Sequence, residues 1–520
     1  MRPEVLVILP VLLPLVSAAL SVVTWRSQMA QRLIAGLGTA ALLVASILLL
    51  QATWQEGFIV MEMSNWPAPF GIVLVADLLS ALMVLMVGIM GISVVIYSLA
   101  VTTEEYEKFG YYPLMHLLHG GVAGAFLTGD IFNLFVWFEV MLIASFALLI
   151  LGGTRAQMEG AVKYVTINLV SSVIFLSAVG LLYGMVGSLN MAHIAQVLQE
   201  ADSPMVTVVA MMFMVSFGIK AGSFPLFFWL PASYHTPPIA VSALFAGLLT
   251  KVGAYALFRM FTLMFMQDVE FTHTVILWAG VLTMVTGVLG AAAQFEFRRI
   301  LSVHIVSQIG YMLMALGLLA SVGLDSDIAK LAIAGGIFYI IHNIIVKTNL
   351  FLVAGVVFQQ MGTYELKKLG GLYRARPMLA LLFFVPALSL AGLPPLSGFF
   401  AKFAVLRAGL EAHEWVAVFF AIGVGALTLY SMVKIWMYVF WRPLPEGSEA
   451  AERLQAPFDK STWPMYVPIV ALFICTILLG VYSEPVFEMV LAAAAQLVDP
   501  SQYIEAVSPH DYMWLGERGE

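Results

Sequence analysis

Long apolar segments recur along the whole chain and constrain its fold more than any other feature. Each is long enough for the about 20 residues that a helix needs to cross a bilayer. Hydropathy places fourteen of them, near residues 5–23, 33–50, 76–99, 112–128, 131–151, 162–185, 205–229, 239–266, 274–293, 301–320, 329–358, 378–406, 415–440 and 465–492. With 61% hydrophobic and 11% charged residues, the chain has more apolar surface than a soluble domain can bury. The sequence therefore predicts an all-α polytopic membrane protein.

Composition also excludes several classes of function. The single cysteine, Cys475, excludes a disulfide framework and a cysteine metal cluster. No basic patch indicates a nucleic-acid partner. The sequence has no nucleotide-binding glycine fingerprint, haem ligand pair or iron–sulfur cysteine set, so we expect no cofactor and no oxidation of a substrate by this chain itself.

Lys and Arg residues are distributed unequally between the two sides of the predicted bundle. The side with both termini holds four, which are Arg2, Arg259, Arg407 and Arg518. Loops after odd-numbered spans hold thirteen, which are Arg26, Arg32, Lys108, Arg155, Arg298, Arg299, Lys367, Lys368, Arg374, Arg376, Arg442, Arg453 and Lys460. Because cytoplasmic loops carry the excess of Lys and Arg, both termini are predicted to lie outside the cytoplasm.

The remaining seven cations fall inside predicted spans or at their edges. They are Lys163, Lys220, Lys251, Lys330, Lys347, Lys402 and Lys434. A lysine at the bilayer centre costs about 2.5–3.5 kcal/mol, so such residues face a protein or water interior and mark ion or proton paths. Snorkelling to the interface explains the three that lie within about two turns of a span end, namely Lys163, Lys330 and Lys434. Apolar or small neighbours flank Lys220, Lys251 and Lys402, which we interpret as proton-transfer groups.

A single carboxylate, Glu139, lies inside the fifth predicted span. Asp130 precedes it by nine residues, beyond side-chain reach along one helix, and is expected to be a cap or entrance residue. Glu139 is either a proton carrier or a paired structural charge, and in both cases its partner must be an intramembrane cation.

Two lysine-bearing spans are interrupted by proline. Residues 220–225 read KAGSFP, and residues 393–402 read LPPLSGFFAK. Proline frees backbone carbonyls, which lipid tolerates only where protein or water satisfies them. A packing kink explains either break alone, whereas two breaks beside lysines indicate a transport site.

Two further spans carry histidines between these breaks. One contains His304, and the next contains His342, Asn343 and Lys347. A histidine titrates near neutrality and can carry protons between lysines, although a lone one is as often a hydrogen-bonded interior residue. We therefore treat His342, Lys347 and His304 as relay candidates.

These residues lie in motifs that resemble the antiporter-like subunits shared by Mrp-type multisubunit sodium/proton antiporters, respiratory complex I and membrane-bound hydrogenases. The resemblance covers most of the chain and is most specific in residues 124–139 (GAFLTGDIFNLFVWFE), 220–226 (KAGSFPL) and 391–399 (AGLPPLSGF) leading to Lys402. Residues 7–15 (VILPVLLPL) and 124–139 are most similar to the D-type subunit of the Mrp antiporter. One complex I subunit type has glutamate at the position of Lys402, so this sequence departs from it.

The resemblance implies two inverted five-helix repeats, spans 4–8 and 9–13, with broken helices 7 and 12. It divides the chain into N-terminal helices (1–111), a first repeat (112–266), a second repeat (267–440) and a cytoplasmic loop, last helix and tail (441–520). It also implies that Glu139, Lys220, Lys251 and Lys402 form a chain of titratable groups in a hetero-oligomeric complex of the plasma membrane.

Three functions compete at this point. The first is exchange of Na⁺ for H⁺ driven by the proton gradient, with other membrane subunits as partners. The second is a proton-pumping subunit of complex I or of a membrane-bound hydrogenase, with electrons handled by other chains. The third, a structural scaffold, does not explain the membrane lysines. No residue spacing identifies a sodium site.

Overall fold

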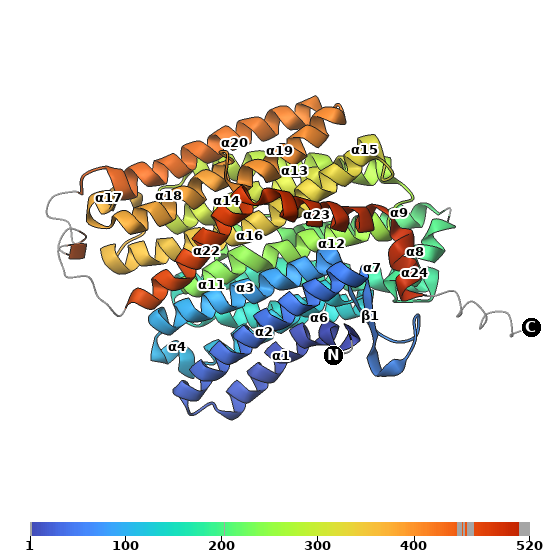
Figure 1. Ribbon diagram of the computed structural model, residues 1–520, viewed down its shortest axis with the longest axis horizontal. Helices are drawn as coiled ribbons and strands as arrows, with labels where there is room; N and C mark the ends of the chain where they lie inside the picture. Colours follow the sequence, from blue (N-terminus) through green and yellow to red (C-terminus); the bar gives the residue numbers. More distant parts are fainter. Residues whose placement is uncertain (1–2, 202, 445–449, 451–452, 455–461, 509–520) are drawn as a thin grey trace, which may run out of the picture.

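The computed structural model describes residues 3–201, 203–444, 450, 453, 454 and 462–508 of the chain. Within this part, twelve helical segments are long and apolar enough to cross a membrane. They are α1 (Pro3–Val23), α2 (Gln28–Glu56), α3 (Leu78–Val101), α6 (Ile131–Ile150), α7 (Arg155–Val186), α9 (Pro204–Ala221), α11–α12 (Ile239–Leu263), α13 (Val269–Ala293), α14–α15 (Phe297–Val322), α16 (Asp327–Met361), α20–η4 (Trp415–Trp441) and α22 (Trp463–Val481). They run side by side along the long axis of the molecule (Figure 1).

Two more predicted spans complete the bundle. The fourth is α5 (Tyr111–Leu127), and the twelfth is a pair of half-length helices, α18 (Pro377–Ala391) and α19 (Ser397–Glu411). The seventh continues past its break into α10 (Trp229–Ser233). The all-α fold with broken helices 7 and 12 is thus confirmed.

The last predicted span, 465–492, is wrong as one straight helix. The chain instead forms α22, bends at Tyr482, and continues as α23 (Ser483–Val498). Pro485 lies in the first turn of α23, where its ring clashes with the carbonyl four residues earlier and prevents a continuous helix.

The connections contain short elements that hydropathy does not detect. They are η1 (Met63–Asn65), α4 (Glu104–Lys108), α8 (Met191–Gln199), η3 (Leu366–Lys368), α17 (Leu372–Ala375) and α24 (Pro500–Val507). Between α2 and α3, β1 (Ile59–Glu62) and β2 (Val73–Ala76) form an antiparallel pair in which Ile59 lies opposite Ala76. This small hairpin is a local exception to the predicted all-α fold.

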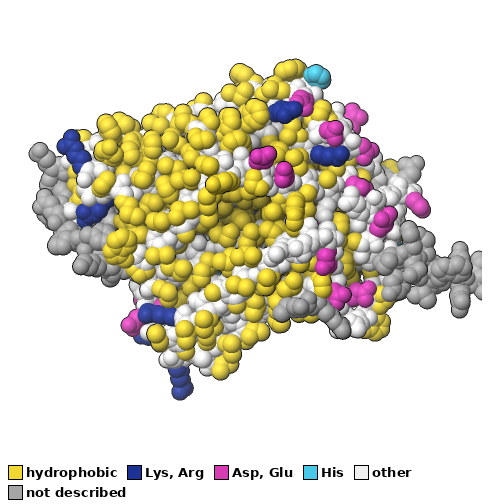
Figure 2. All heavy atoms as spheres, viewed as in Figure 1, with side chains coloured by type: hydrophobic (Ala, Val, Ile, Leu, Met, Phe, Trp, Pro, Cys, Tyr) yellow, Lys and Arg dark blue, Asp and Glu magenta, His cyan; other side chains and the backbone are white. Residues whose placement is uncertain are grey.

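The two ends of the bundle differ in charge. The end with the N-terminus, α8, α15 and α24 is called the terminal end here, and the end with α4 and α17 is called the basic end (Figure 1). Figure 2 shows a broad apolar belt, with Lys and Arg at the edge of the basic end and also among the acidic side chains near the terminal end, where most visible acidic side chains lie. The apolar belt matches the surface that lipid requires of a membrane protein.

A buried ion pair joins α12 to the start of α3 near the terminal end. Arg259 Nη2 lies 2.6 Å from Asp77 Oδ2, and the two side chains are 6% and 1% exposed. Asp77 also caps α3 by accepting from the Ser80 N–H, while Tyr503 of α24 lies with its ring 5.3 Å from the guanidinium of Arg259. Arg259, counted among the cations on the side of the termini, lies near that end but is buried on α12, where Asp77 neutralises it.

We expect Arg259→Leu to destabilise the assembled protein strongly. Removing one partner leaves Asp77 charged and buried, which costs about 3–5 kcal/mol. The matched control is Lys163→Ala, which removes an exposed pair with Glu159 and is expected to change nothing measurable. Thermal unfolding of the purified protein in detergent measures both, and equal melting temperatures for the two variants would contradict the prediction.

Candidate functional site

The two broken helices have the same local structure. Each half-helix ends in the pattern A-G-x-x-P-L, at residues 221–226 and 391–396. Gly222 and Gly392 have φ of +78° and +93°, a left-handed conformation that favours glycine because it has no Cβ. Both glycine N–H groups donate to carbonyls three and four residues earlier. Since α9 starts at the terminal end and α18 at the basic end, the two breaks enter the bundle from opposite sides (Figure 1).

Glu139 and Lys220 meet through a third side chain. Lys220 is 5% exposed at the end of α9 and donates to Ser172 Oγ of α7 over 3.4 Å. Ser172 in turn donates to Glu139 Oε1 of α6. Lys220 also lies 5.6 Å from the centre of the Phe138 ring. The structure thus brings the expected pair together, with a hydroxyl between the two charged groups.

Lys251 is fully buried at the start of α12 (Thr250–Leu263). The preceding π-helix η2 (Phe245–Leu249) widens the backbone, and its Ala246 carbonyl accepts from Lys251 Nζ over 2.5 Å. The Lys251 ammonium is therefore held by a carbonyl oxygen and not by a carboxylate.

Lys347 and His304 lie next along the interior, on facing helices. Lys347 of α16 is fully buried and donates to the Leu301 carbonyl of α14 over 3.2 Å. His304, one turn further along α14, lies within electrostatic reach of Lys347 and Lys402. Lys347 is likewise within electrostatic reach of Lys251. These relay candidates lie between the two broken helices.

Lys402 caps the half-helix that ends at the second break. It is 6% exposed on α19, and its Nζ donates to the carbonyls of Leu390 and Ala391, at 3.1 and 2.8 Å. These are carbonyls at the end of α18, which carry partial negative charge and have no partner in their own helix. The Tyr311 ring lies with its centre 5.0 Å from the same ammonium.

A hydroxyl chain connects His342 to this break. His342 Nδ1 lies 2.9 Å from Ser397 Oγ, which is 3.0 Å from Ser389 Oγ. The three residues come from α16, α19 and α18, so the chain crosses the interruption itself. His342 is fully buried and within electrostatic reach of both Lys402 and Lys347.

Several interior polar atoms between the lysines have no protein partner among the described residues. They are His342 Nε2, both ring nitrogens of His304, Thr250 Oγ1, Ser307 Oγ, Gln308 Nε2, and Nδ2 and Oδ1 of Asn343. A buried polar atom without a hydrogen bond costs about 1–3 kcal/mol. These residues lie on α12, α14 and α16, the helices that also carry Lys251, His304 and Lys347, so these helices present polar groups that can bond water or exchange protons.

The lysines attributed to snorkelling lie in different places. Lys163 is exposed and Lys330 is half-buried, and they pair with Glu159 and Asp327 near helix starts. Lys434 is only 7% exposed, and its Nζ donates to the Ala292 and Gln294 carbonyls at the end of α13, at 2.6 and 2.7 Å. It is therefore a helix cap near the membrane edge and not a side chain extended into water.

Sequence reasoning missed Ser172, Ser397 and Tyr311. Nothing in the sequence distinguishes Ser172 from its neighbour Ser171, because the contact with Glu139 depends on how α6 and α7 pack. Ser397 carried a signal, since it closely follows the double proline. The contact between Tyr311 and Lys402 joins residues far apart in the chain, and no sequence signal indicated it.

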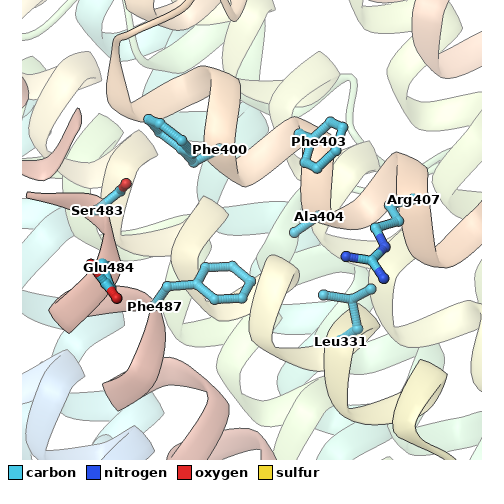
Figure 3. Close-up of a pocket in the computed structure, with 8 residues that line it drawn as sticks. All are labelled: Leu331, Phe400, Phe403, Ala404, Arg407, Ser483, Glu484 and Phe487. Carbon is cyan, nitrogen blue, oxygen red and sulfur yellow. The ribbon is translucent and has the colours of Figure 1, made fainter. Parts of the chain in front are cut away.

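A surface hollow lies apart from this polar line. This cavity of about 250 Å³ separates α16, α19 and α23, and its walls are mainly Phe400, Phe403, Phe487 and Leu331. In Figure 3, Arg407 lies at one end of it and Glu484 at the other. Its lining includes none of the site residues described above, so it is not the candidate site.

The chain also matches known proteins. A family model described as NADH:quinone oxidoreductase/Mrp antiporter, transmembrane, matches residues 128–428, which hold Glu139 and all four site lysines and relay histidines. The chain belongs to this family. It is 47% identical over 503 residues to the D-type Na⁺/H⁺ antiporter subunit of Alkalihalophilus pseudofirmus, covering 96% of this chain and 99% of that one. The motif resemblance is thereby confirmed.

Further relatives agree. The chain is 38% identical over 502 residues to the D-type Na⁺/H⁺ antiporter subunit of Bacillus subtilis, covering 96% of this chain and 99% of that one. A chain in the structure of the Mrp complex from Dietzia sp. DQ12-45-1b superposes with a TM-score of 0.88 at 31% identity, covering 98% of this chain and 100% of that chain. This chain is thus a multi-pass membrane protein of the family, and its bacterial relatives imply the plasma membrane.

Asp130 lies between α5 and α6 at the terminal end. It is 7% exposed and caps α6, with its Oδ1 accepting from the Asn133 N–H over 2.7 Å. Burial raises the pKa of this carboxyl from 3.8 to about 6, and the Asn133 hydrogen bond only partly opposes this. Asp130 thus caps α6, one of the two roles expected for it.

We expect the stability effect of Asp130→Asn to depend on pH. Between pH 3.8 and about pH 6, the folded protein holds a proton on Asp130, whereas the unfolded chain releases it. Stability from this group therefore grows as pH falls below about 6 and is lost as pH rises. Asn keeps the cap but cannot titrate. As the pH is lowered from about 8 to about 5, the melting temperature of the wild type should therefore rise relative to that of the variant. A constant difference across this range would contradict the prediction.

Proposed function

We propose that this chain is a membrane subunit of a multisubunit cation/proton antiporter that exchanges Na⁺ for H⁺ using the proton gradient. The observation that carries the proposal is its identity, over nearly its whole length, to proteins named as D-type subunits of Na⁺/H⁺ antiporters. The chain is then a secondary transporter subunit and not an enzyme. The match to a chain of the Mrp complex supports other membrane subunits as its partners.

Protons travel through the interior along Glu139, Lys220, Lys251 and Lys402, with His342, Lys347 and His304 as relays between them. The support is geometric. Lys251, Lys347 and Lys402 donate to backbone carbonyls, which hold an ammonium less firmly than a carboxylate does. A lysine held in this way can give up and regain a proton, which a guanidinium cannot do near neutral pH.

The membrane orientation places both termini outside the cytoplasm. The uneven distribution of Lys and Arg supports this, since the described loops rich in these residues lie at the basic end. Three cations used in the prediction, Arg2, Lys460 and Arg518, lie outside the described residues. Protons then enter from the terminal end, and Na⁺ leaves toward it.

The chain divides into N-terminal helices (1–111), a first repeat (112–266), a second repeat (267–440) and a C-terminal part (441–520) that extends beyond the described residues. The identical pattern at the two breaks supports the repeat, and the opposite directions of α9 and α18 support its inversion.

A proton-pumping subunit of respiratory complex I or of a membrane-bound hydrogenase is the alternative. One observation favours keeping it: the matching family model is shared with NADH:quinone oxidoreductase. Purifying the native complex separates the two functions, because co-purification of NADH dehydrogenase or hydrogenase subunits would establish the alternative.

Glu139→Ala and Lys220→Ala should each abolish exchange while the complex still assembles. Each change removes one end of the hydroxyl-bridged pair, and a positioned proton-transfer group contributes about 10²-fold or more. The measurement is sodium-dependent collapse of a pH gradient in vesicles, with Lys163→Ala as the control that removes a lysine from a helix surface. Normal exchange by assembled Glu139→Ala vesicles would rule out this route.

Lys402→Arg should fail almost as completely as Lys402→Ala. An arginine can still donate to the Leu390 and Ala391 carbonyls, so the helix break keeps its cap, but its charge is permanent. Exchange is measured between about pH 7 and pH 9. Wild-type rates for Lys402→Arg would show that this position needs only a fixed charge, and would move the end of the route elsewhere.

A further inference from the structure

Among the described residues, Ser172 is the one side chain that is hydrogen-bonded to both Glu139 and Lys220. It lies on α7, is 6% exposed, accepts from Lys220 Nζ over 3.4 Å and donates to Glu139 Oε1. Among the described residues, Glu139 and Lys220 form no direct ion pair. The hydroxyl therefore has one neighbour that gives a proton and one that takes it.

Aromatic side chains pack beside the Lys220–Ser172–Glu139 contact, where Lys220 and Ser172 are buried and Glu139 is partly exposed. Phe138, Phe175 and Phe217 pack against one another beside the pair, and Lys220 lies against the Phe138 ring. Tyr164 is the titratable group that lies within electrostatic reach of Glu139 from α7, and its hydroxyl is taken by Ser145 at 2.6 Å. No other described polar side chain bridges the two.

We propose that Ser172 relays the proton between Lys220 and Glu139, an inference that rests on the proposed proton route. The Lys220 N–H bond breaks as a bond forms to Ser172 Oγ, while the original Ser172 O–H bond breaks and its proton bonds to Glu139 Oε1. The products are a neutral amine, an intact serine and a carboxylic acid, so the charges of the pair cancel together. Rotation of the hydroxyl then restores the starting geometry.

The spacing has a second consequence for turnover. Two opposite charges in direct contact in a medium of low dielectric attract strongly, which would hold the proton on the lysine. A neutral hydroxyl between them lengthens the separation while keeping a continuous hydrogen-bonded path. Ser172 thereby connects Lys220 to Glu139 and also allows proton transfer between them to run in both directions.

Ser171 provides a matched control one residue away. It is also buried on α7 and also faces α9, but its hydroxyl donates to the Ser216 carbonyl over 2.9 Å and contacts neither Glu139 nor Lys220. Ser171→Ala and Ser172→Ala thus remove the same atom from the same helix interface, and only the second interrupts the relay.

The experiment measures sodium-dependent proton flux per assembled complex, in H₂O and D₂O, in vesicles containing the full antiporter. We expect Ser172→Ala to lose about 10²-fold in flux and to show a larger solvent isotope effect, because proton transfer becomes the slow step. Ser172→Thr, which keeps a hydroxyl, should restore most of the flux. Ser171→Ala should match the wild type in both measurements.

Three outcomes would overturn the relay. They are wild-type flux in Ser172→Ala, equal loss in Ser172→Ala and Ser172→Thr, and equal loss in Ser171→Ala and Ser172→Ala. The first shows that the hydroxyl is not needed, and the other two assign the loss to packing. Glu139→Ala in the same assay separates a failure of the relay from a failure of the proposed proton route. If Glu139→Ala is inactive while Ser172→Ala is active, only the relay fails. If Glu139→Ala is active, the proposed route itself fails.

Discussion

A helix cannot be interrupted inside lipid unless the freed backbone groups find partners in the protein, and this constraint organises the interior. At the first break the Ser223 hydroxyl, the Trp229 indole and the Thr283 hydroxyl bond to backbone groups of Gly218, Ile219 and Phe224. At the second break Lys402 occupies the carbonyls that end α18. Polar and charged side chains are therefore required at the places where the chain breaks. At the second break, the residue that satisfies the backbone, Lys402, is also one that the proposed proton route uses.

Four of the buried cations have partners of two different kinds. Arg259 is bound to the carboxylate of Asp77, 2.6 Å away, and this arrangement suits a charge that never changes. Lys251, Lys347 and Lys402 instead donate to carbonyl oxygens. A carbonyl offsets part of the cost of burying an ammonium but, being neutral, also tolerates the amine form. Arg259 is thus paired with a full counter-charge, whereas the three lysines that the proposed proton route uses are held only by partial charges.

Much of this arrangement could be predicted from the sequence because lipid makes strong demands on each segment alone. Hydropathy identifies the spans, and Lys220, Lys402 and Glu139 stand out because a charge among apolar residues is rare. Features that depend on two distant segments could not be found in this way. Ser172 looks like any helical serine until α6 and α7 pack, and nothing near Arg259 in the sequence indicates that Asp77 of a distant segment pairs with it. The bend at Tyr482 had a local signal in Pro485, which hydropathy averages away.

The two breaks share a backbone conformation but differ in where the lysine lies relative to the break. Lys220 precedes its break. Its amine donates to Ser172 of α7, and Ser172 donates to the carboxylate of Glu139 on α6. Lys402 follows its break, so its amine turns back onto the carbonyls of α18, next to a chain of hydroxyls that leads to His342. In the proposed route, one end therefore adjoins a carboxylate, which is neutral when protonated, and the other end adjoins a histidine, which is charged when protonated. Because a repeated structure with identical contacts would have no preferred end, the unequal position of the lysines is what distinguishes the two halves chemically.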